Sequence, residues 1–314
     1  MKNIFFLIVI GITTVTNVYS QEFKLKNYTF DIDHEIIGVA YCNSEFYCLE
    51  SDGKVFSIDS ILHKKTIANA PISSTSIVSI NDSLFVRTKN DSTFYLKNNK
   101  FSFTKRKNDF PFFEDDKYIV EKSCSGEWGG SIYFIDKSDK KKYECASTCP
   151  IIVNKLNETY IVTASLADMA GSTQILKIDD PKALTLFKKR KRKKINYVGD
   201  DESKTTIGSE IIVDSVGVMV TTSFLYERNL FHIVAGNQGT SLCKIENNEF
   251  EEIAKISDDR FWSYNPINVR YSEGKTLSVF RNNNSNGFLF IKENNVTIYS
   301  FYKKKKILSN SPSN

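Results

Sequence analysis

The chain has 314 residues, of which 41% are hydrophobic and 25% are charged, a composition that excludes collagen-like, disordered and small disulfide-rich proteins. Glycine and proline are scarce, at 14 and 6 residues, and 40 residues are aromatic, which favours strands over helices. The net charge of +5 suggests at first a protein that binds nucleic acid or another polyanion.

Residues 1–20 are typical of a secretory signal peptide. Lys2 precedes the apolar run Ile4–Ile10, and the small residues before Gln21 suit cleavage by signal peptidase. The apolar run is about half the ~20 residues that a membrane-spanning helix needs, and a retained anchor helix is the alternative interpretation. We therefore expect a secreted protein, periplasmic or extracellular, in a compartment where disulfide bonds persist.

One strand-like segment recurs six times along the chain, each time ending on an aliphatic residue before a polar turn. These aliphatic anchors are Ile58, Leu96, Ile135, Ile178, Ile245 and Ile291. Their spacings are 38, 39, 43, 67 and 46 residues, so the longest interval contains a normal repeat and an insertion at residues 188–209. Upstream of each anchor, a polar turn and a further strand also recur, which indicates about four strands per repeat.

Four antiparallel strands in about 40 residues are typical of one propeller blade. The runs Gly53–Asp59 and Gly130–Asp136 resemble the repeats of quinoprotein-type and other bacterial β-propellers, a resemblance that implies a fold but transfers no catalytic residue. We predict an all-β protein, a six-bladed β-propeller over residues 21–302 with a basic polar tail at 303–314. The segment Tyr28–Ile32 is expected to join the last blade and close the ring. A β-sandwich or two small β-domains are the alternatives.

The loops that join second to third strands, and those that join one blade to the next, must lie on the same face of such a propeller. The long loops on this predicted loop face contain both tryptophans, Trp128 and Trp262. We expect them to stack on a ligand, with polar contacts from Glu127, Asp168 and Arg260. The alternative is that each tryptophan packs against its own blade.

The six cysteines are Cys42, Cys48, Cys124, Cys145, Cys149 and Cys243. Cys42 and Cys48 flank a tight turn, which allows a local disulfide if their Cβ atoms face each other. Cys243 occupies the apolar position of its repeat and is expected to be a buried free thiol. The other three lie on the loop face, where one disulfide and one free thiol are the simplest outcome. A metal site is the alternative, but no fourth ligand is evident, and we predict none.

No metalloprotease, nucleophile-elbow, phosphate-loop or dinucleotide motif occurs in the sequence, and no cofactor is indicated. We therefore expect an exported binding protein that recognises a saccharide, peptide or protein on the loop face. The alternative is a secreted hydrolase or lyase with carboxylates at the mouth of the channel, using Glu127 or Asp168 as general acid or base.

The positive charge is concentrated in one place. An uninterrupted basic run consists of Lys188, Lys189, Arg190, Lys191, Arg192, Lys193 and Lys194. Without this run and the signal peptide, the rest of the chain has a net charge of −3, so nucleic acid is not an expected partner. The run is interpreted either as a solvated flexible loop or as a contact with an anionic surface.

Overall fold

The computed structural model describes residues 23–105, 111–168, 170–190, 197–281 and 286–303. The predicted signal peptide, nearly all of the basic tail and the second half of the basic run lie outside these residues. The described chain is almost entirely strand. Its two helices are single 3-10 turns, η1 (Gly126–Trp128) and η2 (Pro181–Ala183), and no helix in the described part is long and apolar enough to cross a membrane.

The described strands form six sheets, numbered here in chain order. Sheet 1 contains β2 (Ile36–Cys42), β3 (Glu45–Glu50), β4 (Lys54–Ile58) and β5 (Lys64–Asn69). Sheet 2 contains β6 (Ser74–Ile80), β7 (Ser83–Thr88), β8 (Thr93–Lys97) and β9 (Lys100–Thr104). Sheet 3 contains β10 (Phe113–Glu114), β11 (Tyr118–Cys124), β12 (Gly130–Asp136), β13 (Lys142–Ala146) and β17 (Thr185–Leu186).

The remaining three sheets follow the same order of strands. Sheet 4 contains β14 (Pro150–Leu156), β15 (Thr159–Leu166), β16 (Ser172–Ile178) and β18 (Glu210–Val216). Sheet 5 contains β19 (Met219–Tyr226), β20 (Asn229–Gly236), β21 (Gly239–Glu246) and β22 (Glu249–Ser257). Sheet 6 contains β23 (Trp262–Arg270), β24 (Thr276–Arg281), β25 (Asn286–Lys292) and β26 (Asn295–Lys303), with β1 (Lys24–Ile32) outside β26.

The six aliphatic anchors of the repeat all lie in the third strands, β4, β8, β12, β16, β21 and β25. Polar two-residue turns follow several strands and have positive φ at both positions, as at Asn43 and Ser44 and at Asn247 and Asn248. Such turns match the twist of antiparallel strands, which is why asparagine-rich pairs recur at these places. The predicted repeat of antiparallel strands is confirmed.

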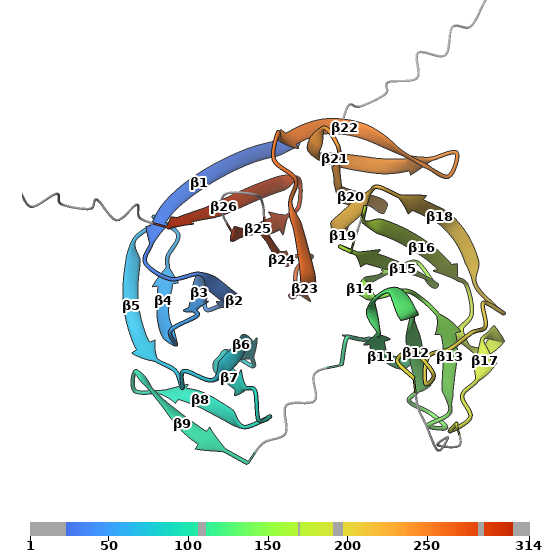
Figure 1. The fold of residues 1–314 in the computed structure, drawn as a ribbon, viewed down its shortest axis with the longest axis horizontal. Helices are drawn as coiled ribbons and strands as arrows, with labels where there is room; N and C mark the ends of the chain where they lie inside the picture. Colours follow the sequence, from blue (N-terminus) through green and yellow to red (C-terminus); the bar gives the residue numbers. More distant parts are fainter. Residues whose placement is uncertain (1–22, 106–110, 169, 191–196, 282–285, 304–314) are drawn as a thin grey trace, which may run out of the picture.

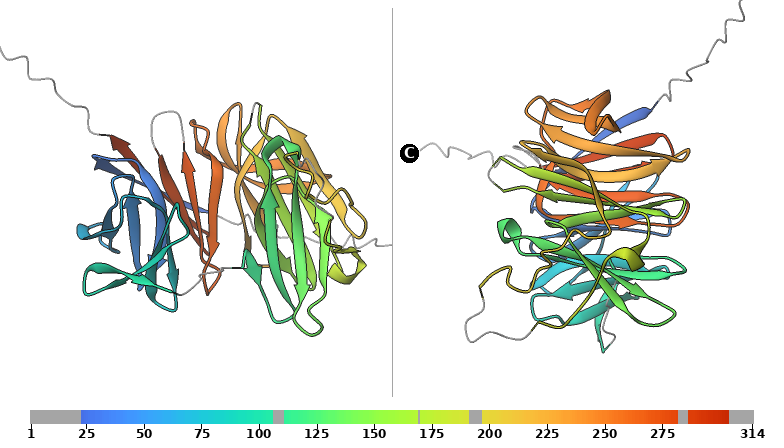
Figure 2. Two further views of the ribbon diagram at one scale, coloured as in Figure 1. Left: turned by 60° about the horizontal axis from the view of Figure 1, so that its bottom comes forward. Right: turned by 90° about the vertical axis from the view of Figure 1, so that its right-hand side faces the viewer.

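The sheets stand around a common centre, with the first strand of each sheet innermost and the later strands progressively farther out (Figure 1). Turned views show the same sheets fanned about this centre (Figure 2). This radial arrangement is that of a β-propeller, which excludes the alternative of a β-sandwich.

The N-terminal strand closes the ring, as the sequence predicted. β1 pairs in parallel with β26, from Lys24 opposite Asn295 to Ile32 opposite Lys303. The first described residues are thereby hydrogen-bonded to the last ones, and the outer edge of sheet 6 is covered.

Buried apolar side chains fill the junctions between neighbouring sheets. Separate clusters join sheets 1 and 2, 3 and 4, 4 and 5, 5 and 6, and 6 and 1. Within the described residues, no such cluster joins sheet 2 to sheet 3. As far as the described residues go, this junction is therefore the open one in the ring.

The prediction of a disulfide between Cys42 and Cys48 was wrong. The turn at Asn43 and Ser44 pairs Cys42 with Glu45 and places Cys48 opposite Val39. The two cysteines consequently point to opposite faces of sheet 1, Cys42 into the junction with sheet 2 and Cys48 into the junction with sheet 6. Because side chains alternate along a strand, their sulfur atoms cannot meet, and both thiols are free and buried.

Candidate ligand-binding cleft

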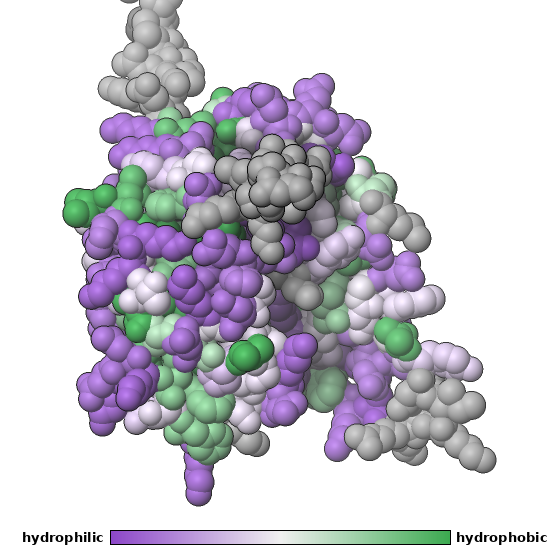
Figure 3. Space-filling model, turned by 60° about the vertical axis from the view of Figure 1, so that its left-hand side comes forward, coloured by the Kyte–Doolittle hydropathy of each residue, from purple (hydrophilic) through white to green (hydrophobic). Residues whose placement is uncertain are grey.

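A cleft of about 1020 Å³ occupies the centre of the ring and the open junction between sheets 2 and 3. It takes lining residues from every sheet except sheet 5. Those used below are Val39, Ile77, Val78, Phe112, Phe113, Lys122, Val269, Arg270 and Tyr271. The space-filling view shows a recess between two halves of the molecule, bordered mainly by hydrophilic surface (Figure 3). The cleft is large enough for several residues of a peptide or a short saccharide.

The inner strands of sheets 4 and 6, β14 and β23, are in contact, and no residue of sheet 5 lines the cleft. Arg270, the last residue of β23, donates from Nη1 to the backbone oxygen of Val153 in β14 over 3.0 Å. Its guanidinium carbon also lies 6.0 Å from the ring centre of Phe113. Loss of hydration lowers the pKa of Arg270, although the side chain is still accessible from the cleft.

Lys122 is a second cation that lines the cleft and donates a hydrogen bond to a backbone oxygen of β14. Its Nζ donates to the backbone oxygen of Pro150 over 2.7 Å and lies 4.4 Å from the ring centre of Phe112. The surrounding protein removes water from the ammonium group, which lowers the pKa of Lys122 to about 8. The side chain is nevertheless exposed to the cleft, so a ligand can reach it.

A β-bulge in β14 explains why both cations reach the same strand edge. Carbonyl groups three residues apart in a regular strand point to opposite sides. In β14 the pairing register shifts between Pro150 and Ile152, which adds one residue and brings the carbonyls of Pro150 and Val153 to the same side. Lys122 from sheet 3 and Arg270 from sheet 6 thus occupy the free inner edge of sheet 4.

The other charged groups that line the cleft are in ion pairs. These pairs are Arg87 with Asp91, Glu114 with Lys137, Glu121 with Lys142, and Lys155 with Asp115. Burial alone would raise the pKa of Asp115, but hydrogen bonds from Lys155 and Tyr160 bring it down to about 2. The excess charge of the cleft is therefore positive and resides on Lys122 and Arg270.

The connections expected on one face do lie together. Gly171, between β15 and β16, packs against Met219 at the start of sheet 5, and Gly239 packs against the backbone of Ser257 and Asp258. Cys124 and Cys149 form a disulfide between the β11–β12 loop and the start of sheet 4. Cys145 is free and buried, which confirms one disulfide and one free thiol among Cys124, Cys145 and Cys149. Cys243 is also a buried free thiol, as predicted.

Trp128 ends η1 on the loop face and is 59% exposed. Glu127, beside it, is exposed as well. Gly199 of the insertion packs directly on the backbone of Trp128, where a Cβ atom would lie 2.5 Å from the Trp128 oxygen. Trp128 therefore belongs to a surface that sheet 3 shares with the insertion.

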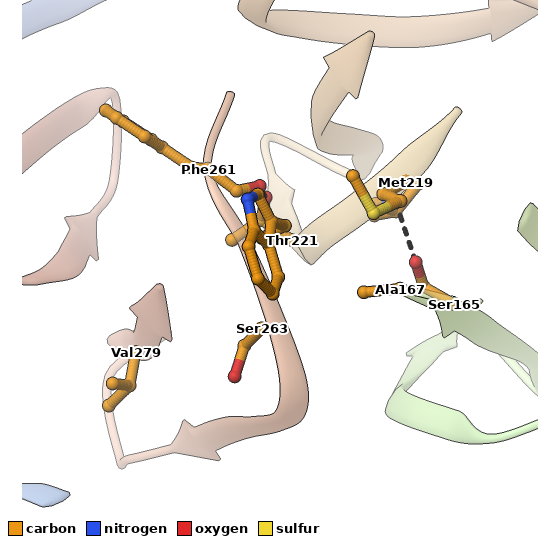
Figure 4. Close-up of a pocket in the computed structure, with 9 residues that line it drawn as sticks. Ser165, Ala167, Met219, Thr221, Phe261, Ser263 and Val279 are labelled. Atoms are coloured by element: carbon orange, nitrogen blue, oxygen red, sulfur yellow. Dashed lines mark hydrogen bonds between the residues drawn. The ribbon is translucent and has the colours of Figure 1, made fainter. Parts of the chain in front are cut away.

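Trp262 lies elsewhere, where sheets 4, 5 and 6 meet. It is half-buried and makes an edge contact with Tyr264, whose ring centre is 4.9 Å away. The adjoining hollow, also lined by Ser165, Ala167, Met219 and Thr221, has about 10 Å³, which is space for one water molecule (Figure 4). Asp168 is exposed on the loop that follows Ala167, and Arg260 is half-buried. No described contact joins Trp128 to Trp262.

The insertion is anchored on sheet 3 by a buried carboxylate. Glu202 accepts hydrogen bonds from the hydroxyl groups of Ser123, Ser125 and Ser131, the last two over 2.6 and 2.7 Å. Burial raises the pKa of Glu202, but these hydroxyl groups outweigh that effect and leave the pKa below its usual value. The described segment 197–209 of the insertion is therefore docked on sheet 3.

The start of the basic run is only partly solvated. Lys188 and Lys189 are exposed, whereas Arg190 binds both carboxylate oxygens of Glu144 at 3.1 and 3.0 Å. For Arg190, the interpretation as a solvated residue was wrong, because a buried carboxylate of sheet 3 holds its guanidinium group. Among the described residues, no group of three His, Cys, Asp or Glu side chains is placed to hold a metal ion.

Sequence reasoning missed the central cleft, although one of its residues carries a signal. Tyr118 and Val120 lie on the buried side of β11, and the alternation assigns Lys122 to the same side. A lysine at such a position indicates either a buried ion pair or a cavity. Nothing in the local sequence of Arg270 gives a comparable signal.

The sequence matches no protein-family model and no curated protein. Solved structures with a similar fold include YCF48 from Cyanidioschyzon merolae, with 9% identity, a TM-score of 0.36 and coverage of 81% of both chains. BamB from Moraxella catarrhalis has 11% identity and a TM-score of 0.36, covering 80% of this chain and 83% of that one. A computationally designed protein, Ika8, has 9% identity and a TM-score of 0.41, covering 87% and 88%. The propeller assignment rests on the sheets themselves.

Proposed function

We propose that this protein is an exported six-bladed propeller that binds a ligand in its central cleft. The observation that carries the proposal is the cleft itself, which five of the six sheets line with aromatic, aliphatic and cationic side chains. The carboxylates of its lining, Glu114 and Glu121, are held by Lys137 and Lys142, which favours binding over acid-base chemistry. The ligand classes are those expected from the sequence: a peptide, a protein or a saccharide.

The loop face is the competing location for the same function. Trp128 and Glu127 are accessible there, and so are Asp168, Lys188 and Lys189. Trp262 and Arg260 are half-buried, and the hollow beside Trp262 holds no more than one water molecule. The central cleft offers the larger enclosed surface, and for this reason we place the ligand there.

Screening peptide and glycan arrays with the chain from Gln21 onward tests this placement. The double variant Phe112→Ala, Phe113→Ala removes aromatic walls of the cleft, and Trp128→Ala, Trp262→Ala removes the tryptophans of the loop face. We expect the first variant to weaken binding of the selected ligand at least about tenfold and the second to leave it unchanged. Weakening by the second variant alone would move the site to the loop face.

Export is tested separately by the N-terminus of the protein recovered from a cell that secretes it. Cleavage before Gln21 and an intact Cys124–Cys149 bond are expected. Recovery of the full-length chain in the cytoplasm with reduced cysteines contradicts export.

A further inference from the structure

We infer that the ligand of the central cleft is an acidic peptide, held in an extended conformation with its carboxylates on Lys122 and Arg270. This inference rests on the proposed function and specifies its ligand.

Both cations keep hydrogen-bond donors available for a ligand. Lys122 donates one described bond, to Pro150, and Arg270 donates one, to Val153. An ammonium group has three donors and a guanidinium group has five, so each can bind a carboxylate without leaving its carbonyl. The nearby acidic groups are already paired with other cations, as shown for Glu114, Glu121 and Asp115.

The spacing of the two cations suits a strand-like ligand. Their carbonyl partners, Pro150 and Val153, flank the bulge and lie opposite Ala164 and Val162, which are two residues apart in β15, roughly 7 Å along a strand. An extended peptide covers the same distance in two residues, whose side chains point to the same face, so acidic side chains, or one side chain and a C-terminal carboxylate, can reach both cations.

The lining of the cleft favours a peptide over a neutral saccharide. Val39, Ile77, Val78 and Val269 give the cleft an aliphatic surface, and Phe112, Phe113 and Tyr271 give it an aromatic one. An extended peptide can present carboxylates to Lys122 and Arg270 and apolar side chains to these walls, whereas a neutral saccharide carries no charge to pair with the two cations. The partner that fits is therefore an acidic segment with apolar residues between its carboxylates.

A purely structural role for the two cations is the competing explanation. Lys122 and Arg270 would then only satisfy backbone oxygens at the free edge of β14. Glutamine separates the two roles because it keeps an N–H donor but has no charge. A structural role predicts a change in stability with no change in peptide preference.

The experiment uses a library of randomised octapeptides passed over the immobilised protein from Gln21 onward, with bound peptides identified by mass spectrometry. The test variant is Lys122→Gln, Arg270→Gln, and the matched control is Lys188→Gln, Lys189→Gln, which removes the same charge from the insertion. We expect the wild type and the control to enrich Asp- and Glu-containing peptides. The test variant should bind the enriched peptides at least about tenfold more weakly.

Each other outcome identifies a different failure. Enrichment of neutral apolar peptides that still requires Phe112 and Phe113 overturns the acidic ligand and leaves the proposed function intact. Retention of no peptide overturns the peptide inference, and the arrays then decide on saccharides. If a thermal unfolding measurement shows that the test variant is not folded, the salt dependence of the wild type is measured instead. Its affinity for the enriched peptides should fall as the salt concentration rises from 50 to 500 mM, and an affinity that does not depend on salt overturns the inference.

Discussion

The two sides of sheet 3 are packed differently in the described residues. Toward sheet 4, buried Tyr118, Phe134 and Tyr160 pack edge to face, with ring centres 5.1 to 5.9 Å apart. The Cys124–Cys149 bond ties the same two sheets together. Toward sheet 2, no cluster of buried apolar side chains forms among the described residues, and the cleft occupies the space instead.

The difference shows how a ring of similar repeats leaves a cleft at one junction. The described inner strand of sheet 3, β10, has two residues, whereas the inner strands β6 and β14 have seven each. A short inner strand brings few side chains to the centre, so the neighbouring sheets cannot close the gap by packing. Strong anchoring on the sheet 4 side keeps sheet 3 in place beside this opening.

The largest expected effect concerns the packed side. Phe134 is fully buried, and Phe134→Ala should lower the free energy of unfolding by about 4 kcal/mol, because it leaves a large cavity in the cluster. Phe113→Ala, a change at the wall of the cleft, should cost about 1 kcal/mol, since its ring is only partly buried where it packs against Tyr160. Urea unfolding measures both. Equal losses would show that the wall of the cleft is packed as tightly as the cluster around Phe134.

The disulfide comes next. It closes a segment with a sequence separation of 25 residues, and the variant Cys124→Ser, Cys149→Ser should be less stable by about 3 kcal/mol. A reductant should lower the melting temperature of the wild type and have no effect on this variant. A reductant response that survives in the variant would mean that other cysteines form the bond.

Glu202 tests whether the insertion helps to anchor sheet 3. Glu202→Gln should cost about 2 kcal/mol, because an amide replaces a carboxylate that accepts three hydroxyl hydrogen bonds. The folded state lowers the pKa of Glu202, so its stabilisation is present above the usual glutamate range and is lost as pH falls through the lowered value. Limited proteolysis of the insertion at decreasing pH measures this loss. The exposed Glu210, changed to Gln, serves as the control and should not alter the cleavage rate.

The smallest effect is the pH dependence of ligand binding on the cleft side. The pKa of Lys122 is lowered to about 8, so the side chain is charged at pH 7 and mostly neutral at pH 9. Affinity for an acidic peptide should therefore fall about threefold to tenfold between these values, because one charge-assisted contact is lost. Isothermal titration calorimetry measures the change, and Lys122→Gln should abolish the pH dependence. A flat profile in the wild type would place the ligand away from Lys122.

Much of the fold was determined by the sequence alone. The anchors from Ile58 to Ile291 repeat with a period that indicates a series of similar sheets, and the alternation in Tyr28–Ile32 predicted the closing strand. These features depend on local strand periodicity, which is written directly in the chain. The same periodicity also contained the answer for Cys42 and Cys48, because a two-residue turn fixes their register and places them on opposite faces.

The tertiary structure alone decided where the cleft lies. Lys122 and Arg270 are far apart in the sequence and meet at the edge of β14 because a bulge turns two carbonyls toward the centre of the ring. Trp128 lies beside the insertion, whereas Trp262 lies at a packed junction between sheets. Such proximity depends on how the sheets close around the axis, and no spacing along the chain encodes that closure.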